Sequence, residues 1–153
     1  MALDPFQTSV WDDAGVLGIE RAGLQGYLDF RPAFSCIELP RLVSEKTSFD
    51  LVYIDGSHLF EDVFIDFYYV ARLLRDGGIV AFDDSADPHI AKVLRFVVKN
   101  LAASFREIDL GPYRLDRGGM RYRAAKWLGK IQVRAFKKTG PAERIWNAKF
   151  ANF

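Results

Sequence analysis

Residues 49–84 constrain the fold more than any other part of the chain. Within them, residues 51–54 form a short apolar run that is typical of a strand buried on both faces. Apolar residues then recur at helical spacing until Gly77, which provides a helix stop. Residues 79–82 form a second apolar run. This order predicts a right-handed strand-helix-strand unit with two parallel strands.

Acidic residues end both of these predicted strands. Asp55 follows the first strand, and Asp83 and Asp84 follow the second. Ligands of open parallel sheets bind outside the carboxyl ends of the strands, so we expect the three carboxylates to converge. Neighbouring like charges raise one another's pKa, and a divalent cation with oxygen ligands relieves that repulsion. The pattern predicts a Mg²⁺-type site, and the alternative is that each Asp ends a strand or caps a helix.

Size and composition indicate one globular domain. The chain has 153 residues, of which 50% are hydrophobic and 14% aromatic, enough for a substantial core. No apolar run reaches the length of a membrane span, and the start MALDPFQ is not a secretion signal, so we expect a cytoplasmic protein. The single cysteine, Cys36, has no neighbouring base and is expected in or near the core rather than as a nucleophile.

The other segments alternate between predicted helices and strands. We expect helices at residues 10–22, 34–43, 88–101 and 121–128, and strands at residues 27–30, 105–110, 113–115 and 131–136. Pro40 is expected to interrupt or redirect the second of these helices. Asp87 is the expected N-cap of the third of these helices, with Pro88 at its first position. The alternation predicts an α/β fold whose last two strands close the sheet as an antiparallel pair.

Charge is distributed unevenly along the chain. Residues 1–116 hold 11 Lys or Arg against 19 Asp or Glu, whereas residues 117–153 hold 10 against the lone Glu143. Basic side chains interleaved with Tyr122 and Trp127 suit contacts with nucleic acid or with an anionic membrane. We favour the alternative that the apolar residues pack on the sheet while the basic ones point to water, so we do not expect a nucleic-acid partner.

Several pieces of the chain, in order, resemble a class I S-adenosylmethionine-dependent methyltransferase. They are LDPF at a strand end, Ser35 with the following ELP segment, FDLVYIDGSH, a long helix, LLRDGG and AFDD. The IDGSH segment is similar to the branch that includes macrocin-type small-molecule O-methyltransferases. The resemblance covers about residues 2–110. It implies a Rossmann-like sheet, mostly parallel with an antiparallel last strand, in a single domain over residues 1–153, with the basic segment 117–153 packed on it or extending from it.

The resemblance also implies a cofactor site. Asp4 corresponds to the acid that holds the ribose hydroxyls of S-adenosylmethionine, and a carboxylate suits that role because it accepts two hydroxyl protons. Ser35 is the second expected cofactor contact. The family's first strand and glycine-rich loop have no counterpart before Asp4, so the chain resembles an N-terminally truncated member.

The same resemblance implies which residues bind a metal ion and which residue takes the proton of the substrate. Metal-dependent members bind Mg²⁺ at positions that correspond to Asp55, Asp83 and Asp84. The ion would bind the substrate hydroxyl and lower its pKa, and His58 would take the proton. The alternative for His58 is a residue that orients the turn behind Ser57 as N-cap. His89 is a reserve candidate, which we interpret as a solvated residue in the first turn of a helix.

These observations predict a methyltransferase that, in its complete form, acts on a hydroxyl of a sugar or other small molecule. The alternative is a truncated, non-catalytic interaction module that binds an acidic partner through residues 117–153. The sequence leaves open the methyl acceptor, the oligomeric state and activity of the chain by itself.

Overall fold

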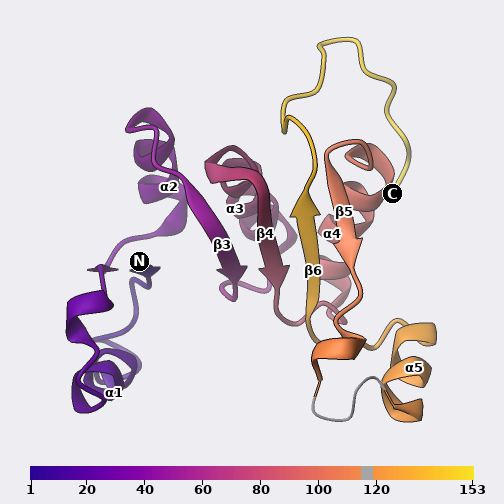
Figure 1. Cartoon of the computed structure of the whole chain (residues 1–153). Helices are drawn as coiled ribbons and strands as arrows, with labels where there is room; N and C mark the ends of the chain where they lie inside the picture. Colours follow the sequence, from indigo (N-terminus) through magenta and orange to yellow (C-terminus); the bar gives the residue numbers. More distant parts are fainter. Residues whose placement is uncertain (115–118) are drawn as a thin grey trace.

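A computed structural model describes residues 1–114 and 119–153, which form an α/β fold (Figure 1). The strands are β1 (Ala2–Leu3), β2 (Phe30–Arg31), β3 (Phe49–Ile54), β4 (Leu74–Phe82), β5 (Phe105–Ile108) and β6 (Arg134–Lys138). The helices are α1 (Ala14–Arg21), α2 (Ser35–Ser44), α3 (Phe60–Leu73), α4 (Pro88–Asn100) and α5 (Met120–Trp127), with 3₁₀ turns η1 (Gln25–Tyr27) and η2 (Gly111–Tyr113). Among the described residues, no helix is both long and apolar enough to cross a membrane.

The described strands form two separate sheets. β1 and β2 pair in parallel, and a four-stranded sheet has the order β3-β4-β6-β5. β3 and β4 are parallel, whereas β6 runs antiparallel to both β4 and β5. The expected antiparallel last strand is therefore confirmed, but the expected mostly parallel sheet is confirmed only in part, because the larger sheet is mixed.

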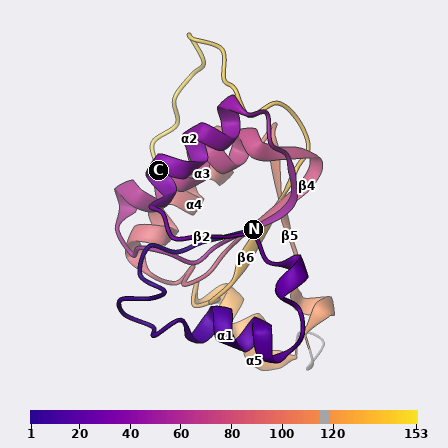
Figure 2. The ribbon, with the colours of Figure 1, turned by 90° about the vertical axis from the view of Figure 1, so that its left-hand side faces the viewer.

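Helices α2, α3 and α4 lie together beside the four-stranded sheet (Figure 2). The centre of the core is aromatic: Phe67 of α3 contacts Phe82 of β4, and Phe82 contacts Phe136 of β6. α4 adds the fully buried residues Val93, Leu94 and Val97. These residues recur at the spacing that predicts an amphipathic helix, so the apolar stripe seen in the sequence is the face that α4 buries.

One face of β3 is exposed, which makes the prediction of a strand buried on both faces wrong. Leu51 is 62% exposed and Tyr53 52% exposed, while Ile54 is buried. No other strand among the described residues pairs with the outer edge of β3. The apolar run identified the strand correctly, but burial of the face that carries Leu51 and Tyr53 would need a layer packed on it, which local sequence does not reveal.

Two further differences concern α2. Pro40 lies inside this helix rather than interrupting it, and the hydroxyl of Ser44 donates to the Pro40 carbonyl oxygen at 3.1 Å. Cys36 is exposed, so the expected core position is wrong. It lies in the first turn of α2, whereas the buried residues of the helix are Glu38, Leu39 and Leu42.

Several expected boundaries also shift. α1 begins at Ala14 rather than at residue 10, and the strand expected at residues 27–30 is replaced by η1 and the short β2. Gly77 does not end α3, which stops at Leu73; it lies within β4 at a φ of 81°. The strand expected at residues 113–115 is not formed at Tyr113, which belongs to η2, and residue 115 lies outside the described residues.

The end of the chain returns to the helices. The ring of Phe153 packs near those of Phe60 and Phe96, with centroid distances of 6.5 and 5.2 Å. Asn100 donates to the carbonyl oxygen of Ala151 at 2.9 Å and accepts from its N–H at 2.9 Å. The last residues of the basic segment are thus held against α3 and α4.

Candidate active site

The parallel register of β3 and β4 places two of the predicted acids side by side. Ile54 is paired with Phe82, and the Asp83 N–H donates to the Ile54 carbonyl oxygen at 3.0 Å, so Asp55 and Asp83 leave the sheet together. Asp55, Asp83, Asp84 and His58 line one cavity of about 10 Å³. The convergence expected from the strand ends is therefore present. We call this group the acidic rim.

Hydrogen bonds fix the carboxylates of the acidic rim. Asp83 accepts from the Tyr53 hydroxyl at 2.7 Å on Oδ2 and from the Asp84 N–H at 2.8 Å on Oδ1. The side-chain amide of Gln132 donates to Asp84 Oδ1. His58 Nε2 lies 3.0 Å from Asp84 Oδ2. Each of the four oxygens of the acid pair therefore has a donor within the protein.

Burial, together with the crowding of negative charge, raises the pKa of two groups. Burial raises the pKa of Asp55, and the charges of Asp83 and Asp84 raise it further, against the opposing effect of His58. Partial burial and the hydrogen bond to Asp83 raise the pKa of Tyr53 to about 12. The Tyr53 hydroxyl thus remains a hydrogen-bond donor to Asp83 at neutral pH.

The acidic rim does not fit the Mg²⁺ site expected from the sequence. Within residues 1–114 and 119–153, no group of three or more His, Cys, Asp or Glu side chains is arranged to hold a metal ion. The oxygens of Asp83 and Asp84 face hydrogen-bond donors instead of a common centre. The arrangement is that of a hydrogen-bonded acid pair next to an imidazole.

His58 lies between two carboxylates just before α3. Its Nδ1 is 3.7 Å from Asp87 Oδ2, on the side opposite Asp84, and about half of its side chain is exposed. The Ser57 hydroxyl accepts from the Leu59 N–H at 3.1 Å, so Ser57 stabilises the turn, while Leu59 rather than Ser57 is the N-cap of α3. His58 is thus held by acids while remaining open to solvent.

His89, the reserve candidate, has a structural contact. Its Nδ1 accepts from the Phe60 N–H at 3.2 Å, which ties the start of α4 to the first turn of α3. The expected N-cap of α4 is confirmed, because Asp87 Oδ1 accepts from the His89 N–H at 2.8 Å. His89 is exposed, as expected, but one of its ring nitrogens is already used.

Asp4 lies directly after β1, as the sequence predicted. Its Oδ1 accepts from the Phe6 N–H at 2.8 Å, and its Oδ2 accepts from the Gln7 side-chain amide at 2.7 Å. Gln7 in turn accepts from the Gly15 N–H at 2.8 Å, at the start of α1. A carboxylate has about four acceptor positions, so the oriented Asp4 keeps positions for two hydroxyls of a ribose. The remaining acceptor positions of Asp4 therefore fit its predicted role of binding the ribose hydroxyls.

Ser35, the second predicted cofactor contact, lies at the start of α2. Its hydroxyl bonds to the carboxylate of Asp66 on α3, a half-buried acid whose pKa is raised chiefly by burial. A Cβ on Gly56 would lie 3.9 Å from Asp66 Oδ2, so the turn after β3 meets the same carboxylate. Asp66 was missed in the sequence, although a lone acid among the apolar residues of an amphipathic helix is a detectable signal. It connects Ser35 with the end of β3 that carries the acidic rim.

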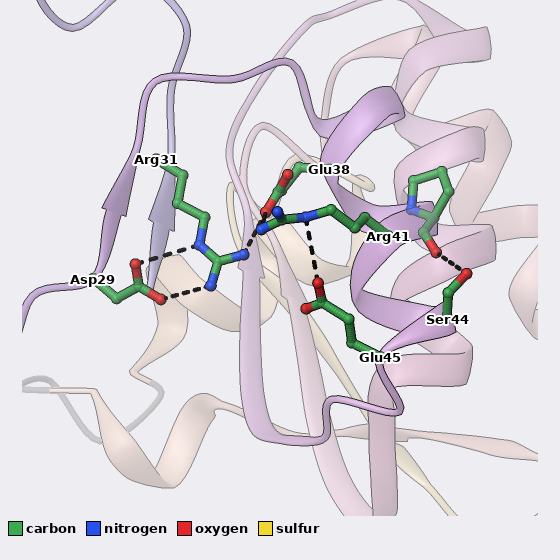
Figure 3. A network of polar contacts seen from close by, with 7 residues as sticks. Asp29, Arg31, Glu38, Arg41, Ser44 and Glu45 are labelled. Atoms are coloured by element: carbon green, nitrogen blue, oxygen red, sulfur yellow. Dashed lines mark hydrogen bonds and ion pairs between the residues drawn. The ribbon is translucent and has the colours of Figure 1, made fainter.

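A charged network fixes the approach to Ser35 (Figure 3). Arg31, at the end of β2, donates to Asp29 and to Glu38. Arg41 donates to the same oxygen of Glu38 at 2.7 Å. The hydrogen bonds from Arg31 and then Arg41 hold the pKa of Glu38 below its usual range, although Glu38 is only 7% exposed. The network joins β2 to α2 and thereby positions the first turn that carries Ser35.

One comparison with known proteins identifies a family to which this chain is similar. A family model described as a methyltransferase domain matches residues 2–85, more than half of the chain. The matched segment begins with β1 and includes Asp4, Ser35, His58 and the acid pair Asp83 and Asp84. No curated protein matches the chain.

Proposed function

Because the chain belongs to this family of methyltransferase domains, we propose that it supports transfer of a methyl group from S-adenosylmethionine to a hydroxyl of a sugar or other small molecule. The observation that carries the proposal is His58, held 3.0 Å from Asp84 and open to solvent beside the strand ends. The similarity of its IDGSH segment to macrocin-type O-methyltransferases supports a small-molecule acceptor.

The cofactor-binding half of the proposal rests on Asp4 and Ser35. Asp4 accepts the ribose hydroxyls, and Ser35 contributes from the start of α2, where its hydroxyl is oriented by Asp66. When bound, S-adenosylmethionine supplies an electrophilic methyl group. The Glu38 network keeps the end of β2 fixed against α2 and so limits motion of this half of the site.

His58 acts as the general base in the proposed reaction. The N–H at Nε2 of His58 donates a hydrogen bond to Asp84. The lone pair of Nδ1 is therefore available to take the proton of the acceptor hydroxyl. With S-adenosylmethionine bound, its methyl group would be the electrophile for the acceptor oxygen, and Nδ1 of His58 would receive the hydroxyl proton. The resulting imidazolium lies between Asp84 and Asp87 and is stabilised by both.

Calorimetric titration of the chain with S-adenosylmethionine tests the cofactor half. We expect saturable binding that Asp4→Asn weakens about tenfold or more, because hydrogen bonds to a charged acceptor contribute about 1.5–3 kcal/mol. Asp12→Asn, on an exposed residue outside the site, is the matched control and should leave the affinity unchanged. Absence of saturable binding at millimolar cofactor, or equal effects of both variants, would contradict the proposal.

The second candidate function is an interaction module that is not catalytic. Its supporting observation is the exposure of Trp127 and Trp146 among basic residues in the described part of the C-terminal segment, residues 119–153. Such a surface suits an acidic partner. This candidate predicts binding to an acidic polypeptide such as polyglutamate that weakens steeply with salt, together with no affinity for S-adenosylmethionine.

A further inference from the structure

A second hollow lies outside the acidic rim, between the end of β5 and helix α5. It has a volume of about 570 Å³, and its lining within the described residues includes Asp109, Gly111, Tyr122, Arg123, Lys126 and Trp127. Figure 1 places η2 and α5 at the same end of the four-stranded sheet as the carboxyl ends of β3 and β4. We call this feature the α5 hollow.

The wall of the α5 hollow is fixed by one carboxylate. Asp109 Oδ1 accepts from the Gly111 N–H at 3.2 Å, the Tyr122 hydroxyl at 3.1 Å and Lys126 Nζ at 3.0 Å. These donors, Lys126 first, hold the pKa of Asp109 below its usual range. A Cβ at Gly111 would lie 2.9 Å from the Tyr122 ring, so this close approach requires glycine. The hollow is therefore shaped by specific contacts.

The chemistry of the hollow suits an anionic ring compound. Asp109 balances the charge of Lys126, so Arg123 leaves the lining with a net positive charge. Arg123 and Trp127 are four residues apart on α5 and lie on the same face of the helix. A guanidinium binds a carboxylate through two parallel hydrogen bonds. The indole of Trp127, which is 86% exposed, offers a flat surface for a ring.

The connection from α5 to β6 leads from this hollow to the acidic rim. Gln132 lies in that connection, and its carbonyl oxygen accepts from the Ser85 N–H at 2.8 Å. Its side-chain amide donates to Asp84. The segment that follows Trp127 thus ends against the acid that orients His58.

We propose that the α5 hollow binds a small ring compound that carries a carboxylate. Arg123 holds the carboxylate and Trp127 stacks on the ring. This binding site is separate from the acidic rim and goes beyond the proposed function.

The test uses 4-hydroxybenzoate as the probe and the full chain without cofactor. The indole N–H signal of Trp127 in NMR spectra, assigned with the variant Trp127→Phe, reports binding at the hollow. We expect a saturable shift that Arg123→Gln weakens about tenfold, as loss of a charge-assisted contact predicts. Arg121→Gln, on another exposed arginine of α5, is the matched control and should change the affinity less than twofold. The uncharged 4-hydroxybenzyl alcohol should bind more weakly than the probe.

Three results would overturn the inference: no shift of the Trp127 signal, equal weakening by both arginine variants, or equal binding of the neutral analogue. Circular dichroism of each variant verifies that the fold is retained. The cofactor titration separates the two proposals. If the cofactor binds and the probe does not, the inference alone fails; if the probe binds and the cofactor does not, the proposed function alone fails.

Discussion

Lys138 provides the sharpest test of how this fold is held together. It is the last residue of β6 and only 8% exposed, and its Nζ donates to the carbonyl oxygens of Ala71 at 2.9 Å and Leu74 at 2.7 Å. The last carbonyls of a helix have no partner within the helix, and a positive charge there interacts favourably with the helix dipole. Lys138 therefore satisfies the C-terminal end of α3 from another element.

The substitution Lys138→Met keeps most of the apolar stem and removes the ammonium group. It deletes two hydrogen bonds from a charged donor and leaves two carbonyl groups without this partner. Each such bond contributes about 1.5–3 kcal/mol, and the gain from no longer burying a charge offsets part of the sum. We expect the free energy of unfolding to fall by about 3 kcal/mol, a large effect for one substitution.

Urea unfolding followed by circular dichroism measures this change. With an m-value of about 2 kcal/mol/M, the midpoint should fall by about 1.5 M. The neighbouring Lys137 is exposed on the other side of β6, so Lys137→Met is the matched control and should change stability by less than about 0.5 kcal/mol. Equal midpoints for the two variants would refute the capping role of Lys138.

Three other predictions concern charged groups near the site. Arg31 holds the pKa of Glu38 below the ordinary 4.5, so ionisation of Glu38 stabilises the fold above that pH, and this stabilisation is lost as the pH falls through the pKa of the folded state. The melting temperature of the wild type should therefore exceed that of Glu38→Gln at pH 7, and the two should converge in stronger acid. Asp83→Asn should lower the pKa of Tyr53 from about 12 toward 10. Ultraviolet titration measures this pKa, with Tyr53→Phe identifying the signal of Tyr53, and an unchanged pKa would show that the hydrogen bond to Asp83 does not contribute to it. Calorimetry with Mg²⁺ should give no saturable binding to the free chain, and a tight site that Asp83→Asn abolishes would contradict the hydrogen-bonded arrangement.

Local patterns in the sequence were sufficient for the elements around the acidic rim. The spacing of apolar residues identified α3 and α4, and the Asp87-Pro88 pair located the start of α4 to the residue. Acids at the ends of two adjacent parallel strands must meet, so the grouping of Asp55 with Asp83 followed from topology alone. These features depend on residues close in sequence or on one simple pairing.

The errors have a different physical origin, because they depend on contacts between distant segments. β3 was expected to be buried on both faces, yet the face with Leu51 and Tyr53 is exposed, because burial of a face depends on the elements that pack on it. Tyr53 and Gln132 satisfy the acid pair, but Gln132 comes from a segment 48 residues beyond Asp84 and carries no local signal. The fit of the acidic rim to Mg²⁺ depends on the same kind of contact, because Gln132, which donates to Asp84, carries no local signal in the sequence.

The two halves of the proposed site are joined by side chains and helix packing. In the part of the chain that the structure describes, no strand pairing connects β1 and β2 with the four-stranded sheet. Asp4 and the acidic rim are instead related through the contact of Phe6 with Phe34 and through the bond of Ser35 with Asp66, which reaches α3. Side-chain contacts adjust more easily than a backbone ladder. In the proposed reaction, the distance between the cofactor half and His58 would therefore be set by the α2 to α3 interface, and the Glu38 network at the start of α2 would influence that distance from outside the proposed site.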